Sequence, residues 1–158
     1  MNNINKVLVR TAFLMAVAGL LLVANGCKKD DGPTQTQGDK ILEAIVGTWS
    51  FGTSGIPNEA AALISNPSIT VTTSGSTATF ISDSSSGLNA FITGGIFTVN
   101  PDGSITSVAV NSASDSGLSI SDPTVTASEN ELKISFSATA TGGRMNGIGT
   151  WTIDISLN

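Results

Sequence analysis

The sequence predicts an all-β fold, an antiparallel up-and-down β-barrel of about eight strands with one or two short helices. Three observations support this prediction. From Gly47 onward Ser, Thr, Gly and β-branched residues dominate, apolar and polar residues alternate, and turn signals recur at short intervals. Because the same signals fit two packed sheets, a two-sheet β-sandwich is the alternative.

The last two strands have the clearest pattern. Segments 131–140 and 148–157 both alternate apolar with polar residues, which is typical of strands that bury one face and expose the other. The segment between them, 141–147, is rich in glycine. We therefore expect the two strands to form a hairpin.

Shorter strands precede this hairpin. We expect them at 46–52, 68–73, 77–82, 95–100, 104–111 and 123–127, with turns at 74–76 and 101–103. Segment 89–93 is either a separate strand or joins the next one through a bulge at Gly94 and Gly95.

Two short helices are expected among the strands. Segment 57–64 begins with proline, has an early acidic residue and contains three consecutive alanines. Segment 39–45 is a second candidate, with Asp39 as its cap and the first strand directly after it.

The N-terminus has the pattern of an export signal. Lys6 and Arg10 precede an uncharged run, 12–24, which has the length of a signal-peptide core and is shorter than the roughly 20 residues needed to span a bilayer. Small residues followed directly by Cys27 resemble a bacterial lipobox, although Ala24 stands where a branched aliphatic residue is usual. The resemblance implies a lipoprotein signal peptide at 1–26 and acyl chains on Cys27. An ordinary secretory signal and an uncleaved anchor are the alternatives.

Four charged residues follow the cysteine: Lys28, Lys29, Asp30 and Asp31. They resemble the short export signal of surface lipoproteins of the Bacteroidota. The resemblance implies an outer-membrane, lipid-anchored protein exposed on the cell surface. The alternatives are a protein on the periplasmic face and a plain solvated tether. Segment 27–39 is polar and predicts a flexible tether, which leaves 40–158 as a single β domain.

Charge narrows the range of partners. Lys6 and Arg10 lie in the signal segment and all 12 acidic residues follow Cys27, so the mature chain has a formal charge of −7. This charge disfavours a nucleic-acid partner and attraction to an anionic membrane. Attachment to a membrane would depend on the acyl chains of Cys27.

Composition also disfavours an enzyme. The chain has no histidine and no tyrosine, and its one cysteine is assigned to lipid. These absences exclude a Ser-His-Asp or Cys-His site and a zinc site built on His or Cys. Glu129 and Glu131 are the closest pair of carboxylates after the tether, and we interpret them as solvated turn residues. We expect no catalytic residues, metal or cofactor.

The two tryptophans lie in identical tripeptides, Gly-Thr-Trp, at 47–49 and 149–151. In an even-stranded up-and-down barrel the first and last strands are neighbours, so strands 46–52 and 148–157 are expected to pair and to bury Trp49 and Trp151. Gly47 and Trp49, after a short helix, also resemble the Gly-x-Trp motif of lipocalin-like domains. In that family a basic residue stacks over this tryptophan, and Arg144 is the one arginine of the mature chain.

The lipocalin resemblance implies a barrel that holds a small apolar ligand. The residues that would contact the ligand are Trp49, Leu132, Ile134, Phe136 and Trp151. An eight-stranded barrel can also be filled by its own side chains. The alternative function is therefore a structural or interaction lipoprotein without a ligand cavity, acting as an accessory in adhesion or glycan capture.

Overall fold

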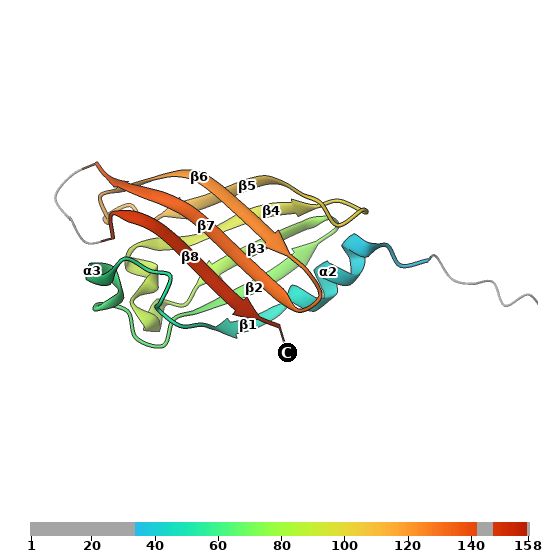
Figure 1. The fold of residues 1–158 in the computed structure, drawn as a ribbon, viewed down its shortest axis with the longest axis horizontal. Coiled ribbons are helices and arrows are strands. Elements are labelled where there is room, and N and C mark those ends of the chain that lie inside the picture. Colours follow the sequence, from blue (N-terminus) through green and yellow to red (C-terminus); the bar gives the residue numbers. More distant parts are fainter. Residues whose placement is uncertain (1–33, 142–146, 158) are drawn as a thin grey trace, which may run out of the picture. The chain divides into compact units, whose positions relative to one another are not determined.

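The computed structural model describes residues 34–141 and 147–157. Residues 35–158 belong to one compact unit, and this unit contains two antiparallel sheets (Figure 1). The first sheet is formed, in this order, by β1 (Gly47–Ser50), β2 (Ser68–Ser74), β3 (Thr77–Ser82), β4 (Ile92–Val99) and β5 (Ile105–Ser112). The second is formed by β6 (Leu118–Ala127), β7 (Glu131–Ala140) and β8 (Gly149–Ser156).

The all-β prediction is confirmed, and the closed barrel is wrong. β1 and β8 lie in different sheets and do not pair. The outer edge of β8 is instead held by the loop after β1, because the backbone N–H of Thr152 donates to the carbonyl of Gly55 at 2.6 Å. β5 contacts β6 without a ladder of hydrogen bonds, so the strands divide there into two sheets. The two-sheet sandwich, the alternative expectation, fits this arrangement.

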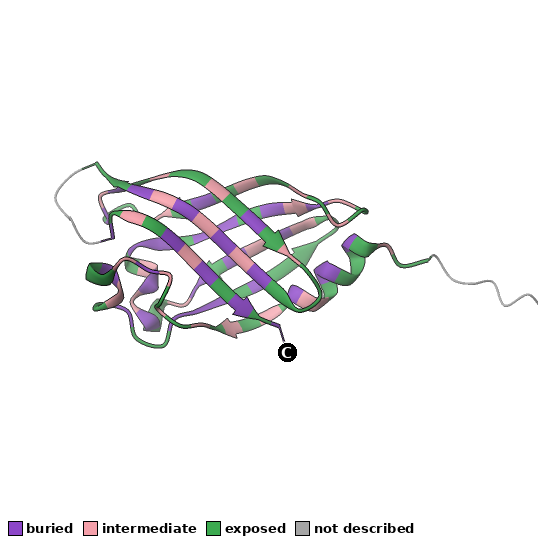
Figure 2. Ribbon diagram, viewed as in Figure 1, coloured by how far each residue is buried: buried purple, intermediate pink, exposed green. Residues whose placement is uncertain are grey.

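The hairpin of the second sheet is confirmed. β7 spans 131–140 as expected and pairs with β8 from Glu131 to Ala138. Leu132, Ile134 and Phe136 are buried while their neighbours are more exposed, and the same alternation runs along β8 (Figure 2). Ala140, expected on the inner face, is exposed at the end of β7.

The strands before this hairpin mostly follow the expected segments. Segment 89–93 does not form a separate strand, since Ile92 already belongs to β4 and the ladder to β5 is irregular between Ile92 and Gly94. β6 is longer than the expected segment 123–127. It begins at Leu118 and passes through Asp122 and Pro123, where the register with β7 shifts.

Helix α2 (Gln37–Ile45) precedes β1 and buries Ile41, Leu42 and Ile45. Its cap is Thr36 rather than Asp39. The Thr36 hydroxyl accepts from the backbone N–H of Asp39 at 3.1 Å, and the Asp39 carboxylate accepts from the backbone N–H of Thr36 at 2.9 Å. This reciprocal pair is a capping box, in which the acidic residue occupies the third helical position.

Helix α3 (Asn58–Ala61) confirms the expected short helix, in a shorter form. Pro57 lies just before it and accepts the first backbone bonds through its carbonyl. Together with the 3-10 turns η1 (Ser84–Ser86) and η2 (Leu88–Ala90), it covers one end of the sheets (Figure 1).

One continuous core fills the space between the two sheets. Its largest fully buried side chains are aromatic: Phe80 and Phe97 from the first sheet, and Phe136 and Trp151 from the second. The buried face of α2 and several aliphatic residues complete the core. The chain thus stabilises itself mainly by apolar burial.

Candidate functional site

Trp151 is the centre of an aromatic cluster in the core. Its ring stacks on Phe136, with centroids 5.6 Å apart and an angle of 15° between the planes, and it meets Phe91 at 5.7 Å and 47°. Its indole N–H donates to the carbonyl of Gly147 at 2.7 Å. The side chain is fully buried. Every polar and apolar part of this indole therefore has a partner within the protein.

Trp49 repeats the same local geometry in the first sheet. Its indole N–H donates to the carbonyl of Ile45 at 2.8 Å, again four residues earlier in the chain. Gly47, two residues before Trp49, has a φ of 142°, and Gly149 before Trp151 has a φ of 127°. Only glycine adopts these angles easily, and they turn the chain so that the indole reaches back to the carbonyl. Trp49 is half-buried and packs at the margin of the core.

The structure brings together four of the five residues expected to contact a ligand. Leu132, Ile134 and Phe136 lie on the inner face of β7, and Trp151 lies directly opposite Phe136 on β8. All four are 0–2% exposed. Trp49 belongs to the other sheet. None of the five lines either of the two described surface depressions.

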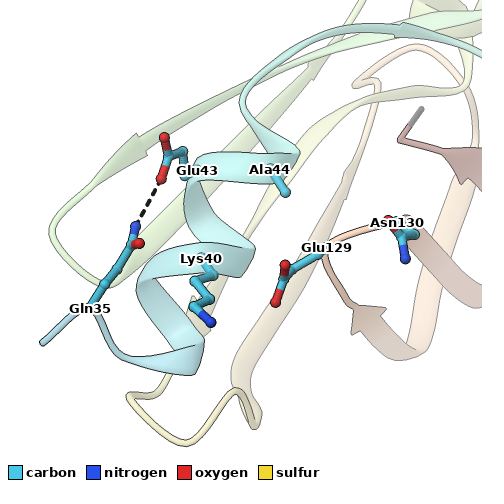
Figure 3. A pocket seen from close by; sticks show the side chains of 6 residues that line it. All are labelled: Gln35, Lys40, Glu43, Ala44, Glu129 and Asn130. Atoms are coloured by element: carbon cyan, nitrogen blue, oxygen red, sulfur yellow. Dashed lines mark hydrogen bonds between the residues drawn. The ribbon is translucent and has the colours of Figure 1, made fainter.

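The larger depression is an open polar groove beside α2 (Figure 3). It has a volume of about 440 Å³ and is lined by Gln35, Lys40, Glu43, Ala44, Glu129 and Asn130. Gln35 donates to Glu43 at 2.8 Å, and Gln37 donates to Glu129 at 3.3 Å. The lining residues are far apart in the sequence, so no pattern in the sequence predicted the groove.

Three aspartates have a pKa held below the usual value of 3.8 by hydrogen bonds from nearby residues. Thr36 lowers the pKa of Asp39, Ser85 that of Asp83, and Ser104 that of Asp102. Each carboxylate closes a turn or a helix start through backbone and hydroxyl donors. Their hydrogen bonds indicate a structural role, since each carboxylate stabilises a turn or the first turn of a helix.

We expect these carboxylates to make the fold sensitive to acid. Because their folded pKa values are depressed, their stabilisation is complete above about pH 5, where unfolded aspartate is also almost fully ionised, and is lost as the pH falls through the folded values. Thermal unfolding followed by circular dichroism from pH 6 to pH 2 measures this loss. The triple variant D39N/D83N/D102N should be less stable at pH 6 and lose less on acidification.

Asp115 provides a matched control, because it accepts one longer bond, 3.4 Å, from the adjacent Ser114. Because this single bond is long, Asp115→Asn should leave the free energy of unfolding at pH 6 close to that of the native protein. If the triple variant and the native protein lost equal stability between pH 4 and pH 2, these three carboxylates would not cause the acid sensitivity.

Within residues 34–141 and 147–157, no three His, Cys, Asp or Glu side chains are grouped as metal ligands. In the same ranges, no helix combines the length and the apolarity needed to cross a bilayer. Glu129 and Glu131 are both exposed, as expected, but only Glu129 lies in the β6–β7 turn, since Glu131 is already the first residue of β7.

The residues expected to direct the protein to a membrane lie outside the described ranges. These are the lipid-attachment residue Cys27 and the export residues Lys28, Lys29, Asp30 and Asp31. Arg144, considered for stacking on a tryptophan, also lies outside them.

No protein-family model, curated protein or solved structure matches this chain.

Proposed function

We propose that this chain is a lipid-anchored outer-membrane lipoprotein, exposed on the cell surface, whose β domain works through its exterior as a non-enzymatic structural or interaction domain. The proposed cellular location rests on the sequence. Three features support it: a signal-like segment at 1–26, a single cysteine directly after it, and the Lys-Lys-Asp-Asp tetrad that follows Cys27. The absence of histidine and tyrosine from the sequence supports a role without catalysis.

The observation that carries the choice of an exterior role is the packing around Trp151. A ligand-enclosing barrel needs apolar side chains that face a space, whereas Trp151 is stacked on Phe136 and tilted against Phe91, with its N–H bonded to Gly147. A guest at this position would have to displace these contacts. Close-packed interiors resist such displacement.

Carriage of a small apolar ligand between the two sheets is the second candidate. It is favoured by Trp49, which is half-buried on the edge strand β1, and by the separation of β1 and β8 into different sheets. An apolar molecule could enter there between the sheets and reach the inner face of β7, where Leu132 and Ile134 carry no charge.

Tryptophan fluorescence separates the two candidates. We expect titration with fatty acids, retinoids and a hydrophobic dye to leave the emission unchanged, because both indoles already bond to backbone carbonyls. A saturable shift that disappears in Trp49→Phe and persists in Trp151→Phe would favour the carrier and contradict the exterior role. Burial of apolar surface contributes about 25 cal/mol per Å² to the free energy of binding, so an enclosed ligand could bind with micromolar affinity.

The proposed lipidation of Cys27 can be tested directly. Mass spectrometry of the membrane-extracted protein should show Cys27 as an acylated N-terminus, and Cys27→Ser should release the chain from the membrane fraction. An unmodified N-terminus, or firm retention of Cys27→Ser, contradicts the anchor.

Surface exposure is read separately in the same cells. Protease shaving should remove the domain from intact cells, and replacing Lys29, Asp30 and Asp31 by alanine should protect it. Equal shaving of both forms would show that the tetrad is only part of the tether.

A further inference from the structure

The first sheet contains no charged residue. Strands β1 to β5 contain no Asp, Glu, Lys or Arg, although the mature chain carries a net charge of −7. The second sheet differs, since Asp122, Glu131, Lys133 and Asp154 all lie in its strands. The charge of the described domain is thus confined to the second sheet, the helices and the loops.

The outer face of the first sheet consists mainly of threonine and aliphatic side chains, which present hydroxyl and methyl groups. Thr72, Thr79, Ile96 and Ala109 form one row across β2 to β5, each opposite the next in register. A parallel row includes Thr48, Thr70 and Ile81. We call the outward residues of these two rows the neutral face.

Two large apolar side chains lie at the centre of the neutral face. Ile81 is 58% exposed and Ile96 is 42% exposed. They are diagonal neighbours on adjacent strands, because Ile96 is opposite Thr79, two residues before Ile81. Ile81 itself is opposite Gly94, which has no side chain to cover it. Apolar residues grouped at the centre of an uncharged, hydroxyl-rimmed surface are the composition of a protein interface.

We propose that the neutral face binds the neutral face of a second copy of this chain, so that two first sheets pack face to face around Ile81 and Ile96. The inference rests on the proposed function, because it names the partner that binds the outer surface of the β domain. A second copy is favoured over an uncharged glycan, since the face has exposed aliphatic side chains and no aromatic ring for a sugar to stack on.

The distribution of charge is also compatible with a second copy as the partner. Two copies with a charge of −7 repel each other wherever their acidic residues come close. Because strands β1 to β5 contain no charged residue, two neutral faces can meet without opposing like charges from their own strands. In a two-fold symmetric pair, each isoleucine would meet the equivalent residues of its partner.

The size of the face agrees with a weak dimer. The strands have 4, 7, 6, 8 and 8 residues. With about 3.3 Å per residue and about 4.8 Å between strands, each copy contributes about 500 Å², so the pair removes about 1,000 Å² from solvent, which is the lower limit for a specific interface. Anchoring both copies in one membrane raises their effective concentration and would populate such a dimer.

Thiol cross-linking tests the interface in the full-length anchored chain. Thr72→Cys places a thiol on the neutral face, and Thr126→Cys places one on an exposed threonine of β6 in the charged sheet. With a short bismaleimide, we expect a covalent dimer from Thr72→Cys and at least tenfold less from Thr126→Cys. Adding Ile96→Lys to Thr72→Cys should weaken the dimer by roughly a hundredfold, because the charge is introduced in both copies.

Ile96→Thr, which extends the threonine pattern without a charge, should weaken the dimer to an intermediate degree and keep the fold. Circular dichroism melting checks that both variants of Ile96 remain folded. Equal cross-linking at Thr72 and Thr126, no cross-linking at Thr72, or an unchanged dimer in folded Ile96→Thr and Ile96→Lys would overturn the proposal. The proposed function is tested independently of the dimer. Mass spectrometry of the N-terminus tests lipidation, and the fluorescence titration tests whether the domain carries a ligand.

Discussion

Replacing Trp151 with alanine is expected to lower the free energy of unfolding by about 3–5 kcal/mol. The ring is fully buried, stacks on Phe136 and contacts Phe91, so its removal leaves a cavity between these two remaining rings. A domain of this size is stable by only about 5–15 kcal/mol, and the variant should therefore be close to unfolding at room temperature. Equilibrium denaturation in urea, followed by far-ultraviolet circular dichroism, measures the change.

Trp49→Ala is the matched comparison, because Trp49 lies in the same tripeptide and makes the same backward hydrogen bond while being half-buried. It should cost clearly less than Trp151→Ala. Trp151→Phe should recover most of the loss, since it keeps an aromatic ring against Phe136 and gives up the bond to Gly147. Equal losses from the two alanine variants would mean that the aromatic cluster is not a principal source of stability.

Gly95→Ala should destabilise the first sheet by at least about 1–3 kcal/mol. Gly95 lies directly opposite Phe80 in the β3–β4 ladder, and the Phe80 ring occupies the space above it. An added Cβ would overlap this ring and also the backbone carbonyl of Ala109 on β5. The ring can shift, but the carbonyl is part of the sheet, so the strand itself must move. Thermal unfolding of Gly95→Ala compared with the native chain measures the effect.

Gly52→Ala is the control for this prediction, because no atom lies within 4 Å of a Cβ at that position. It should be neutral or stabilise the protein by about 0.4–1 kcal/mol, through the reduced freedom of the unfolded chain. If Gly95→Ala were tolerated as well as Gly52→Ala, the close approach of Phe80 would be of no energetic consequence.

The elements predicted best are those in which alternation and turn chemistry agree. β7 was predicted with its observed bounds because Leu132, Ile134 and Phe136 alternate with polar residues and a polar turn precedes them. β6 was predicted only in its second half. Asp122 and Pro123 look like a break in the sequence, whereas the strand continues through them by a shift of register.

The barrel closure was wrong for a physical reason that the tryptophans explain. The repeated Gly-Thr-Trp tripeptide was interpreted as two strands brought side by side, yet each copy records a local event: a glycine with positive φ and an indole that bonds to the carbonyl four residues earlier. A short motif of this kind fixes the conformation around itself and carries no information about which strands are neighbours.

The candidate site was predicted in part. The inward face of β7 and its registered neighbour Trp151 follow from period-2 patterning, so their grouping was accessible from the sequence. Whether they face a space or each other depends on the separation of the two sheets and on the ring of Phe91, which comes from a segment far away in the chain. The groove beside α2 is lined by Lys40 and Glu129 among others, and no local sequence pattern connects residues so far apart in the chain.

The meander order of the strands has a consequence for how the chain folds. Each described strand pairs only with its predecessor or its successor in the chain, and the longest connection within a sheet is segment 51–67, so no pairing has to close a loop that spans several strands. Such a sheet can grow strand by strand from its N-terminal end. The first sheet ends at Ser112, before any residue of the second sheet is required. Until β6 to β8 arrive, its inner aromatic residues Phe80 and Phe97 lack their cover, and this interval is when a nascent chain would be most prone to aggregate.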